Sequence, residues 1–478
     1  MKEITLGIEI LDSYKSMNEE ELDKQLLECV EKNEKKIIVL DDDPTGVQTV
    51  HDVSVYTDWS EESIREGFND AGKLFYILTN SRGFTVEQTI KCHTEIIQNV
   101  NKISKETGKE YMIISRGDST LRGHYPLETE LLCKGFEADG TRHVDGEIIC
   151  PFFKEGGRFT IGNIHYVKNE NLLVPAGQTE FAKDKTFGYT SSNLCEYIEE
   201  KTEGRYLADG VTCISLEELR EAKIDKITEK LLKVENFGKV VVNAVDYCDL
   251  KVFVIALYKT MKQGKNFMFR VAAAIVKVIG GISDQPLLTR KDMVIKETKN
   301  GGIIVVGSHT QKTTRQVEEL KKLKDLVFME FNSDLVLDET AFQKEIENTL
   351  KTEEELISSG KTVVVYTKRK LLVVENDTKE DALIRSVKIS EAVQSLVGKL
   401  KVTPAFVIAK GGITSSDVGT KALQVRKANV LGQICPGIPV WQTGAESKFP
   451  MMPYIIFPGN VGEAATLKEA VEILLNKK

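Results

Sequence analysis

Acidic residues crowd the sequence directly after an early hydrophobic run. The run KIIVL is followed by DDDPTGVQTVHD, residues 41–52. Three successive acids cannot all form ion pairs at low energetic cost, whereas a helix cap needs only one of them. We interpret Asp42 and Asp43 as carboxylates that could orient or deprotonate a substrate hydroxyl. A charged turn in which one aspartate caps the next helix is the alternative.

Arginines and hydroxyl groups follow the next hydrophobic runs. TNSRGFT (79–85) follows LFYIL, and SRGDSTLRGHYPLE (115–128) follows YMII. Guanidinium groups bind carboxylates and phosphates in bidentate fashion, so these segments predict a clamp for a small polyhydroxylated acid. Asp118 is a third candidate for the catalytic carboxylate. An ordinary loop and a capped helix start with solvated arginines are the alternatives. The residues that we expect to contact the acid are Asn80, Ser81, Arg82, Arg116, Ser119 and Arg122.

Another polar segment, PFFKEGGRFTIGNIHYV, follows the run EIIC. Lys154 and Arg158 surround its Gly-Gly turn and could add positive charge. His165 and His51 also lie near these polar segments. A lone histidine near a loop is more often a hydrogen-bonded structural residue than a catalytic one, so we favour structural roles for both.

Glycine-rich turns follow hydrophobic runs in the second half of the chain. They are GSHTQKTTRQ (307–316), KGGITSSDVG (410–419) and PGNVGEAATL (458–467). Glycine lets the backbone approach a phosphate closely, and amides and hydroxyls at a helix start bind anions. Each motif alone could be a plain tight turn, but three at one sheet edge predict a nucleotide site. The residues that we expect there are Ser308, Gly411, Gly412, Thr414, Ser415, Gly459, Asn460 and Gly462.

Two common nucleotide fingerprints are missing from the sequence. GxxxxGK[ST] does not occur, and GxGxxG does not follow a first strand. An NAD-dependent dehydrogenase built on two α/β domains is therefore disfavoured.

Continuous apolar runs separated by helical stretches are typical of parallel sheets covered on both faces. Ligands of such sheets bind beyond the carboxyl ends of the strands, where the polar segments above begin. The strands that we expect are 36–40, 74–78, 111–114, 147–150, 239–243, 266–271, 302–306, 327–331, 362–366, 405–409 and 453–457.

A length of 478 residues exceeds that of one ordinary domain. We expect an α/β protein of two domains, each a largely parallel sheet flanked by helices. The expected domains are 1–285, which binds the substrate, and 300–478, which binds the nucleotide, with the boundary in 280–300. Residues 17–32 predict an amphipathic helix with Leu22, Leu26, Leu27 and Val30 on one face. Segment 160–190 is interpreted as a loop or an excursion from the first sheet.

The composition excludes several classes of protein. A net charge of -8 offers no basic surface for nucleic acid. No apolar run reaches the roughly 20 residues that span a bilayer. The first 14 residues lack a basic region typical of a signal peptide. The eight cysteines are scattered without a CxxC pair, so we expect reduced thiols and a cytoplasmic protein.

Together, the motifs DDDPTG, TNSR, RGDSTLRG, VGS, GGITSS and PGNVG resemble those of the four-carbon acid sugar kinases. The resemblance covers nearly the whole chain from Lys36 onward. These are two-domain bacterial enzymes that phosphorylate acids such as threonate, erythronate or their 3-oxo relatives. The family implies an N-terminal substrate domain and a C-terminal ATP-binding domain that close across a cleft.

Carried over position by position, the resemblance assigns the acid pair to Asp42 and Asp43. It assigns the sugar-acid loops to Asn80, Ser81, Arg82, Asp118, Ser119 and Arg122. It assigns the nucleotide-binding turns to Ser308, Gly411, Gly412, Thr414, Ser415, Gly459 and Gly462. The sequence departs from the family at Asp41, where a small residue is usual, at Pro44, where Leu is usual, and at Arg116, where Lys is usual. These departures lie in the substrate half, so they bear on which acid is bound.

The resulting hypothesis is a kinase that uses ATP and Mg²⁺, with no metal-binding residue assigned. Arg82, Arg116 and Arg122 would hold the carboxylate of a small anionic sugar acid, and one of the three candidate aspartates would serve the attacking hydroxyl. A kinase for another hydroxy acid and a non-catalytic nucleotide- and metabolite-binding protein are the alternatives. We expect no nucleic-acid or membrane partner and mildly favour a homodimer.

Overall fold

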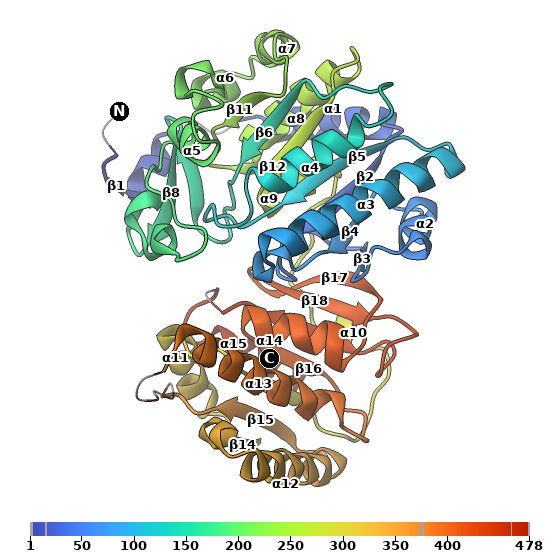
Figure 1. The fold of residues 1–478 in the computed structure, drawn as a ribbon, viewed down its shortest axis with the longest axis vertical. Helices are drawn as coiled ribbons and strands as arrows, with labels where there is room; N and C mark the ends of the chain where they lie inside the picture. Colours follow the sequence, from blue (N-terminus) through green and yellow to red (C-terminus); the bar gives the residue numbers. More distant parts are fainter. Residues whose placement is uncertain are drawn as a thin grey trace. The chain divides into compact units, whose positions relative to one another are not determined.

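The chain forms two compact units, which the computed structural model shows as mostly parallel β-sheets flanked by helices (Figure 1). The predicted α/β class is therefore confirmed. The first unit comprises Met1–Gly46 and Asp58–Asp284, and the second comprises Val47–Thr57 and Gln285–Lys478. The structure describes residues 3–14, 17–370, 372, 374, 377–459 and 461–476.

Parallel strands form the main sheet of the first unit, in the order β10-β11-β6-β12-β5-β2-β4. Each apolar run that predicted a strand here forms one, because its side chains are buried on both faces of the sheet. The strands are β2 (Lys36–Asp41), β4 (Leu74–Leu78), β5 (Tyr111–Arg116), β6 (Gly146–Cys150), β10 (Thr212–Ile214), β11 (Gly238–Val242) and β12 (Phe267–Val271).

Helices of the first unit pack in two groups. One group is α2 and α4 packed on α3, and the other is α1, α6, α7 and α9 packed on α8. Figure 1 shows α3 and α4 on the near face of the sheet. The helices are α1 (Glu19–Lys32), α2 (Glu61–Asn69), α3 (Val86–Thr107), α4 (Leu127–Phe136), α5 (Leu194–Lys201), α6 (Leu216–Arg220), α7 (Ile224–Leu232), α8 (Tyr247–Met261) and α9 (Ala273–Ile279).

Segment 160–190 contains a small antiparallel sheet rather than only a loop. β7 (Arg158–Ile161), β8 (Ile164–Asn169) and β9 (Leu172–Pro175) form a meander, and β1 (Leu6–Gly7) pairs with β9. The β7–β8 turn is Gly162-Asn163, and both residues have positive φ (57° and 66°), as a tight hairpin turn requires. Short 3₁₀ turns at Ala176–Gln178 and Glu180–Lys183 follow.

The second unit has a mixed sheet in the order β3-β17-β18-β19-β16-β13-β15-β14. Pairing is parallel from β19 to β14 and antiparallel from β3 to β19. The strands are β3 (Val53–Tyr56), β13 (Ile303–Val306), β14 (Leu326–Phe331), β15 (Thr362–Thr367), β16 (Val407–Lys410), β17 (Lys427–Cys435), β18 (Ile438–Thr443) and β19 (Pro453–Phe457). Its helices are α10 (Arg290–Met293), α11 (Gln311–Leu320), α12 (Glu339–Ser358), α13 (Lys379–Gly398), α14 (Gly412–Asp417) and α15 (Thr466–Leu474).

Strand β3 belongs to the second unit although it lies early in the sequence. Val53 to Tyr56 pair antiparallel with Val430 to Lys427 of β17. Residues 47–57, which the sequence analysis included in the first domain, are thus part of the second unit. The remaining domain limits stay predictions.

Helix α1 begins and ends close to the predicted limits 17–32 and packs within its own unit on α8. Leu22, Leu26 and Val30 are buried, but Leu27 is 53% exposed, so its predicted place on the buried face is wrong. Leu27 follows Leu26 by about 100° around the helix, which turns its side chain away from α8. None of the helices in the described residues has the length and apolar character needed to cross a bilayer.

The neighbouring leucines of α1 provide a test of this packing. We expect Leu26→Ala to lower the free energy of unfolding by about 2–4 kcal/mol, because it removes a buried side chain and leaves a cavity. Leu27→Ala is the control and should change it by less than about 0.5 kcal/mol. Urea denaturation followed by circular dichroism measures both, and equal effects would contradict the observed orientation of α1.

Candidate functional site

The carboxyl ends of β2, β4 and β5 lie side by side in the first unit. Asp41 at the end of β2 pairs in register with Leu78 of β4 and with Arg116 of β5. The segments that follow these strands therefore start from one edge of the sheet, where ligands of parallel sheets bind.

Asp42 is buried against the guanidinium of Arg82. Arg82 donates from Nη2 to Asp42 Oδ1 (2.6 Å) and from Nε to Oδ2 (3.2 Å), and its Nη1 donates to Asp43 Oδ2 (3.2 Å). Burial raises the pKa of Asp42 to about 6, although Arg82 and then Arg270 act to lower it. Asp42 thus titrates closer to neutrality than an ordinary aspartate.

Arg116 is the second cation of this cluster. Its Nη2 forms an ion pair with Asp41, lies 3.3 Å from Asp42 Oδ1 and donates to the Asp43 carbonyl oxygen (2.7 Å). A side chain at Gly46 would come within 2.1 Å of the Arg116 guanidinium, which explains the glycine of the TG turn. The aspartate run and the two arginines therefore form one buried network, and the protein's own carboxylates occupy Arg82 and Arg116.

Asp118 lies on the loop that follows β5 and is held by its own neighbours. Arg122 Nε donates to Asp118 Oδ2 (2.7 Å), and the Thr120 hydroxyl donates to the same oxygen. Burial alone would raise the pKa of Asp118, but Arg82, Arg122 and the Thr120 hydrogen bond hold that pKa well below its ordinary value. Among the described residues, no group donates to Oδ1 of Asp118. This carboxylate is thus anionic and keeps one oxygen for a ligand.

The remaining predicted substrate residues have different surroundings. Asn80 adopts a left-handed conformation (φ 55°), which asparagine tolerates better than most residues. The Ser81 hydroxyl donates to the buried Glu128 (2.6 Å), so it is engaged within the protein. Ser119 accepts a hydrogen bond at its carbonyl oxygen from His165 Nε2 (2.8 Å).

The two histidines have structural partners, as the sequence analysis favoured, whereas Lys154, which was expected to add positive charge, is paired with an aspartate. His165 is buried between the Ser119 carbonyl and the Thr160 hydroxyl (3.0 Å), and burial lowers its pKa to about 4. His51 lies in the second unit and contacts Asp52 (2.7 Å). Lys154 donates to Asp246 (2.8 Å) on the surface of the first unit.

Sequence reasoning missed Arg270, a cation beneath the 117–123 loop. It lies in β12 with 6% of its surface exposed, and its Nη2 donates to the Arg122 carbonyl oxygen (2.7 Å). A Cβ at Gly117 would lie 1.1 Å from Arg270 Nη1, so the loop can cross the guanidinium only with glycine there. The signal was an arginine inside the apolar run FMFRV, since a charge in a buried strand needs partners.

The three glycine-rich turns of the second unit converge at one edge of its sheet. Strands β13, β16 and β19 are adjacent and parallel, so their carboxyl ends lie together. A Cβ at Gly307 would lie 2.2 Å from the Thr414 hydroxyl, and one at Gly411 would lie 3.1 Å from Ser308 Cβ. Gly411 has φ 124°, and a Cβ at Gly459 would lie 3.7 Å from the Ser308 hydroxyl. Backbone and hydroxyl groups thus surround one small region, as in an anion-binding site.

Hydroxyl groups and a half-buried arginine line the same turns. The hydroxyl groups of Ser308 and Thr310 each lie 3.0 Å from that of Thr313 at the start of α11. Arg369, which follows β15, donates from Nη2 to the Ser308 carbonyl oxygen (2.5 Å). Its Nη1 is buried without a partner among the described residues. Arg369 was missed because it lies in a charged run, KRK, with no glycine turn beside it.

Three other predicted nucleotide residues lie in or beside the same turns. The Ser415 hydroxyl donates to the Ala409 carbonyl oxygen (2.7 Å) inside the unit. Gly412 begins α14, and Gly462 (φ 82°) leads toward α15. The predicted residue Asn460 lies outside the described residues.

Lys410 at the end of β16 is fully buried and donates to the Pro458 carbonyl oxygen. Burial, and to a smaller extent the charge of Lys312, lower its pKa to about 7. Lys410 thereby connects the second and third glycine-rich turns.

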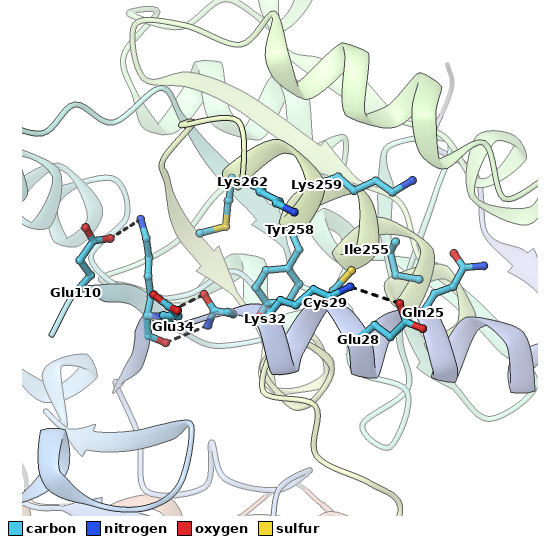
Figure 2. Close-up of a pocket in the computed structure, with 13 residues that line it drawn as sticks. Gln25, Glu28, Cys29, Lys32, Glu34, Glu110, Ile255, Tyr258, Lys259 and Lys262 are labelled. Atoms are coloured by element: carbon cyan, nitrogen blue, oxygen red, sulfur yellow. Dashed lines mark hydrogen bonds and ion pairs between the residues drawn. The ribbon is translucent and has the colours of Figure 1, made fainter.

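A cavity of about 610 Å³ lies elsewhere, between α1 and α8 (Figure 2). Its lining includes Cys29, Lys32 and Lys259, together with Lys35 and Glu110, which precede β2 and β5. These positions are at the amino ends of the strands, opposite the edge where ligands of parallel sheets bind. None of the residues predicted for substrate or nucleotide lines it.

Comparison with known proteins identifies both halves of the chain. Residues 37–279 match the sugar-binding N-terminal domain, and residues 303–467 match the nucleotide-binding C-terminal domain. No curated protein matches the sequence.

Two solved structures share the fold of the chain. One is a Haemophilus influenzae protein with a domain of unknown function (TM-score 0.61, 17% identity), which aligns over 91% of this chain and 100% of its own. The other is a Salmonella typhimurium protein provisionally named a tRNA synthase (TM-score 0.63, 16% identity), which aligns over 91% and 98%.

The raised pKa of Asp42 predicts a pH-dependent stability. A carboxyl group whose folded pKa (about 6) exceeds its unfolded value (3.8) stabilises the fold at low pH, and that contribution is lost as pH rises through 6. The quantity to compare is the free energy of unfolding of the wild type minus that of Asp42→Asn. We expect this difference to fall by about 2–3 kcal/mol between pH 4 and pH 7. Urea denaturation of both proteins across this range measures the difference. A constant difference would contradict the burial effect.

Proposed function

The chain belongs to the family of proteins with a sugar-binding N-terminal domain and a nucleotide-binding C-terminal domain, and from this we propose that it is an ATP-dependent kinase of a small sugar acid. The acceptor would be a hydroxyl of a four-carbon type acid. The observation that carries the proposal is the pairing of two sites in one chain. An aspartate–arginine cluster lies at the ligand edge of the sugar-binding unit. A cradle of glycines and hydroxyl groups lies at the ligand edge of the nucleotide-binding unit.

Asp118 is the residue that we propose to serve the acceptor hydroxyl. Its carboxylate is anionic, and its Oδ1 has no donor among the described residues, so it can accept a hydrogen bond from that hydroxyl. Asp42 has the pKa better suited to a base, but both of its oxygens are bound by Arg82. Phosphoryl transfer requires alignment more than proton removal, so we assign alignment to Asp118 and charge balance to Asp42 and Asp43.

The nucleotide phosphates would lie against Ser308, Gly411, Thr414 and Gly459. These residues present hydroxyls and closely packed backbone without a bulky side chain, which suits a phosphate group. The unpartnered Nη1 of Arg369 at the same turns would balance phosphate charge.

When bound together with the nucleotide, Mg²⁺ would supply positive charge that stabilises the negative charge developing during transfer. The described residues contain no cluster of three or more histidine, cysteine or acidic side chains arranged around a metal. This fits Mg²⁺, which commonly binds through substrate phosphates, waters and one or two carboxylates.

A coupled ADP-release assay tests the proposed reaction. Mg-ATP is supplied with a panel of four- and five-carbon sugar acids, and we expect acid-dependent release of ADP. Asp118→Asn and Arg122→Ala should each lower kcat/KM by at least about 100-fold, because both remove charged groups from the loop that holds the acceptor. Asp225→Asn, an exposed aspartate paired with Lys259, is the control and should retain activity. Bound ATP without ADP release from any acid would instead indicate a non-catalytic binding protein.

Gly411 tests the nucleotide cradle separately. Gly411→Ala places a Cβ at φ 124°, 3.1 Å from Ser308, so we expect the Kd for Mg-ADP to rise at least about tenfold. Gly360→Ala is the matched control, since Gly360 also has positive φ (84°) but precedes β15 at the opposite edge of the sheet. Calorimetry measures both, and an unchanged Kd in Gly411→Ala would place the phosphates elsewhere.

A further inference from the structure

The arginines near Asp118 differ in whether they have a carboxylate partner. Arg82 and Arg116 form ion pairs with the aspartate run, and Arg122 forms one with Asp118. Arg158 and Arg270 form no ion pair with any described residue. An arginine without an ion-pair partner can bind a ligand carboxylate, so these two arginines are the candidates for that role.

Arg270 is an unsuitable ligand residue because the protein backbone covers it. Its Nη2 binds the Arg122 carbonyl oxygen, and Gly117 lies directly against its Nη1. Arg158 differs, since it is only partly buried and lies at the start of β7 in the small antiparallel sheet. Its Nη1 donates to the Gly156 carbonyl oxygen, and its Nε is buried without a partner among the described residues.

Arg158 shares an aromatic neighbour with Arg122. The guanidinium carbons of Arg122 and Arg158 lie 5.1 and 5.7 Å from the centre of the Phe181 ring, which belongs to the 3₁₀ turn Glu180–Lys183. Burial lowers the pKa of Arg158, Asp118 raises it and Arg122 lowers it, so the three charges are close enough to interact. Arg122 and Arg158 therefore lie near one another and near the Asp118 carboxylate.

Arg122 has capacity for a second carboxylate. Its Nε binds Asp118, whereas its Nη1 lies 3.9 Å from Asp184 Oδ2, which is beyond hydrogen-bond distance. A ligand carboxylate could therefore take the place of Asp184 and bind both arginines through short, charge-assisted hydrogen bonds.

We propose that Arg158, together with Arg122, forms the subsite that binds the carboxylate of the substrate. This inference rests on the proposed function in taking a sugar acid as the ligand. It assigns to the small sheet and its 3₁₀ turns the role of selecting acids over neutral sugars. The acid's hydroxyls then lie toward Asp118, which adjoins both arginines.

Binding of threonate and erythronate in the absence of nucleotide tests the subsite, with the neutral alcohol threitol as the comparison. We expect Arg158→Gln to weaken acid binding at least about tenfold in calorimetry, and Arg158→Lys to weaken it less because the charge remains. Threitol binding should be the same in the wild type and Arg158→Gln. Lys154→Gln is the matched control, because Lys154 lies four residues away and pairs with Asp246, and its acid binding should stay within about twofold of wild type.

Circular dichroism and thermal melting verify that each variant is folded. Acid binding that is equal in folded Arg158→Gln and wild type overturns the subsite, even if the protein releases ADP. Arg158-dependent acid binding without ADP release supports the subsite and overturns only the proposed kinase reaction. Wild-type protein that binds neither acid overturns the subsite as well.

Discussion

The ion pairs at the carboxyl ends of β2, β4 and β5 are the interactions on which the first unit depends. Asp42 is 4% exposed and Arg116 is 5% exposed, and either charge alone would be strongly unfavourable at that depth. Because Asp41 and Arg116 are register partners on adjacent strands, the same contact neutralises charge and fixes strand order. The loops after these strands can therefore hold their positions before any ligand is present.

The second unit has different groups at the carboxyl ends of its parallel strands. Its turns gather glycines, hydroxyls and carbonyl oxygens, with Arg369 and the buried Lys410 as neighbouring cations. Among the described residues of these turns there is no ion-pair network like that of the first unit. Phosphates are anionic and bind well to backbone amides. A sugar acid has several hydroxyls, which donate hydrogen bonds to carboxylates, and one carboxylate, which binds guanidinium groups. The contrast between the two edges thus follows the chemistry of the two ligands that we propose.

Strands buried on both faces could be predicted from sequence because their apolar runs are continuous, as in β2 and β13. β17 could not, since its residues alternate between buried and partly exposed and Gly432 interrupts the pairing. The pair Gly162-Asn163 is typical of a tight hairpin turn. The polar and glycine-rich composition around it instead favoured a loop in segment 160–190. At the candidate sites, Asp118 and Gly411 could be proposed from motifs because they stand beside glycine and hydroxyl neighbours in the sequence. Arg270 escaped notice, because its role depends on a loop about 150 residues away in sequence.

The position of β3 bears on how the chain can be synthesised and divided. Residues 53–56 leave the ribosome long before residues 427–430, with which they pair. The second unit therefore cannot complete its sheet until almost the whole chain has been made, and β3 lacks its partner strand until then. A fragment that starts at Gln285 would lack β3 and would leave the edge of β17 exposed. A single cut in the sequence therefore cannot separate the two units.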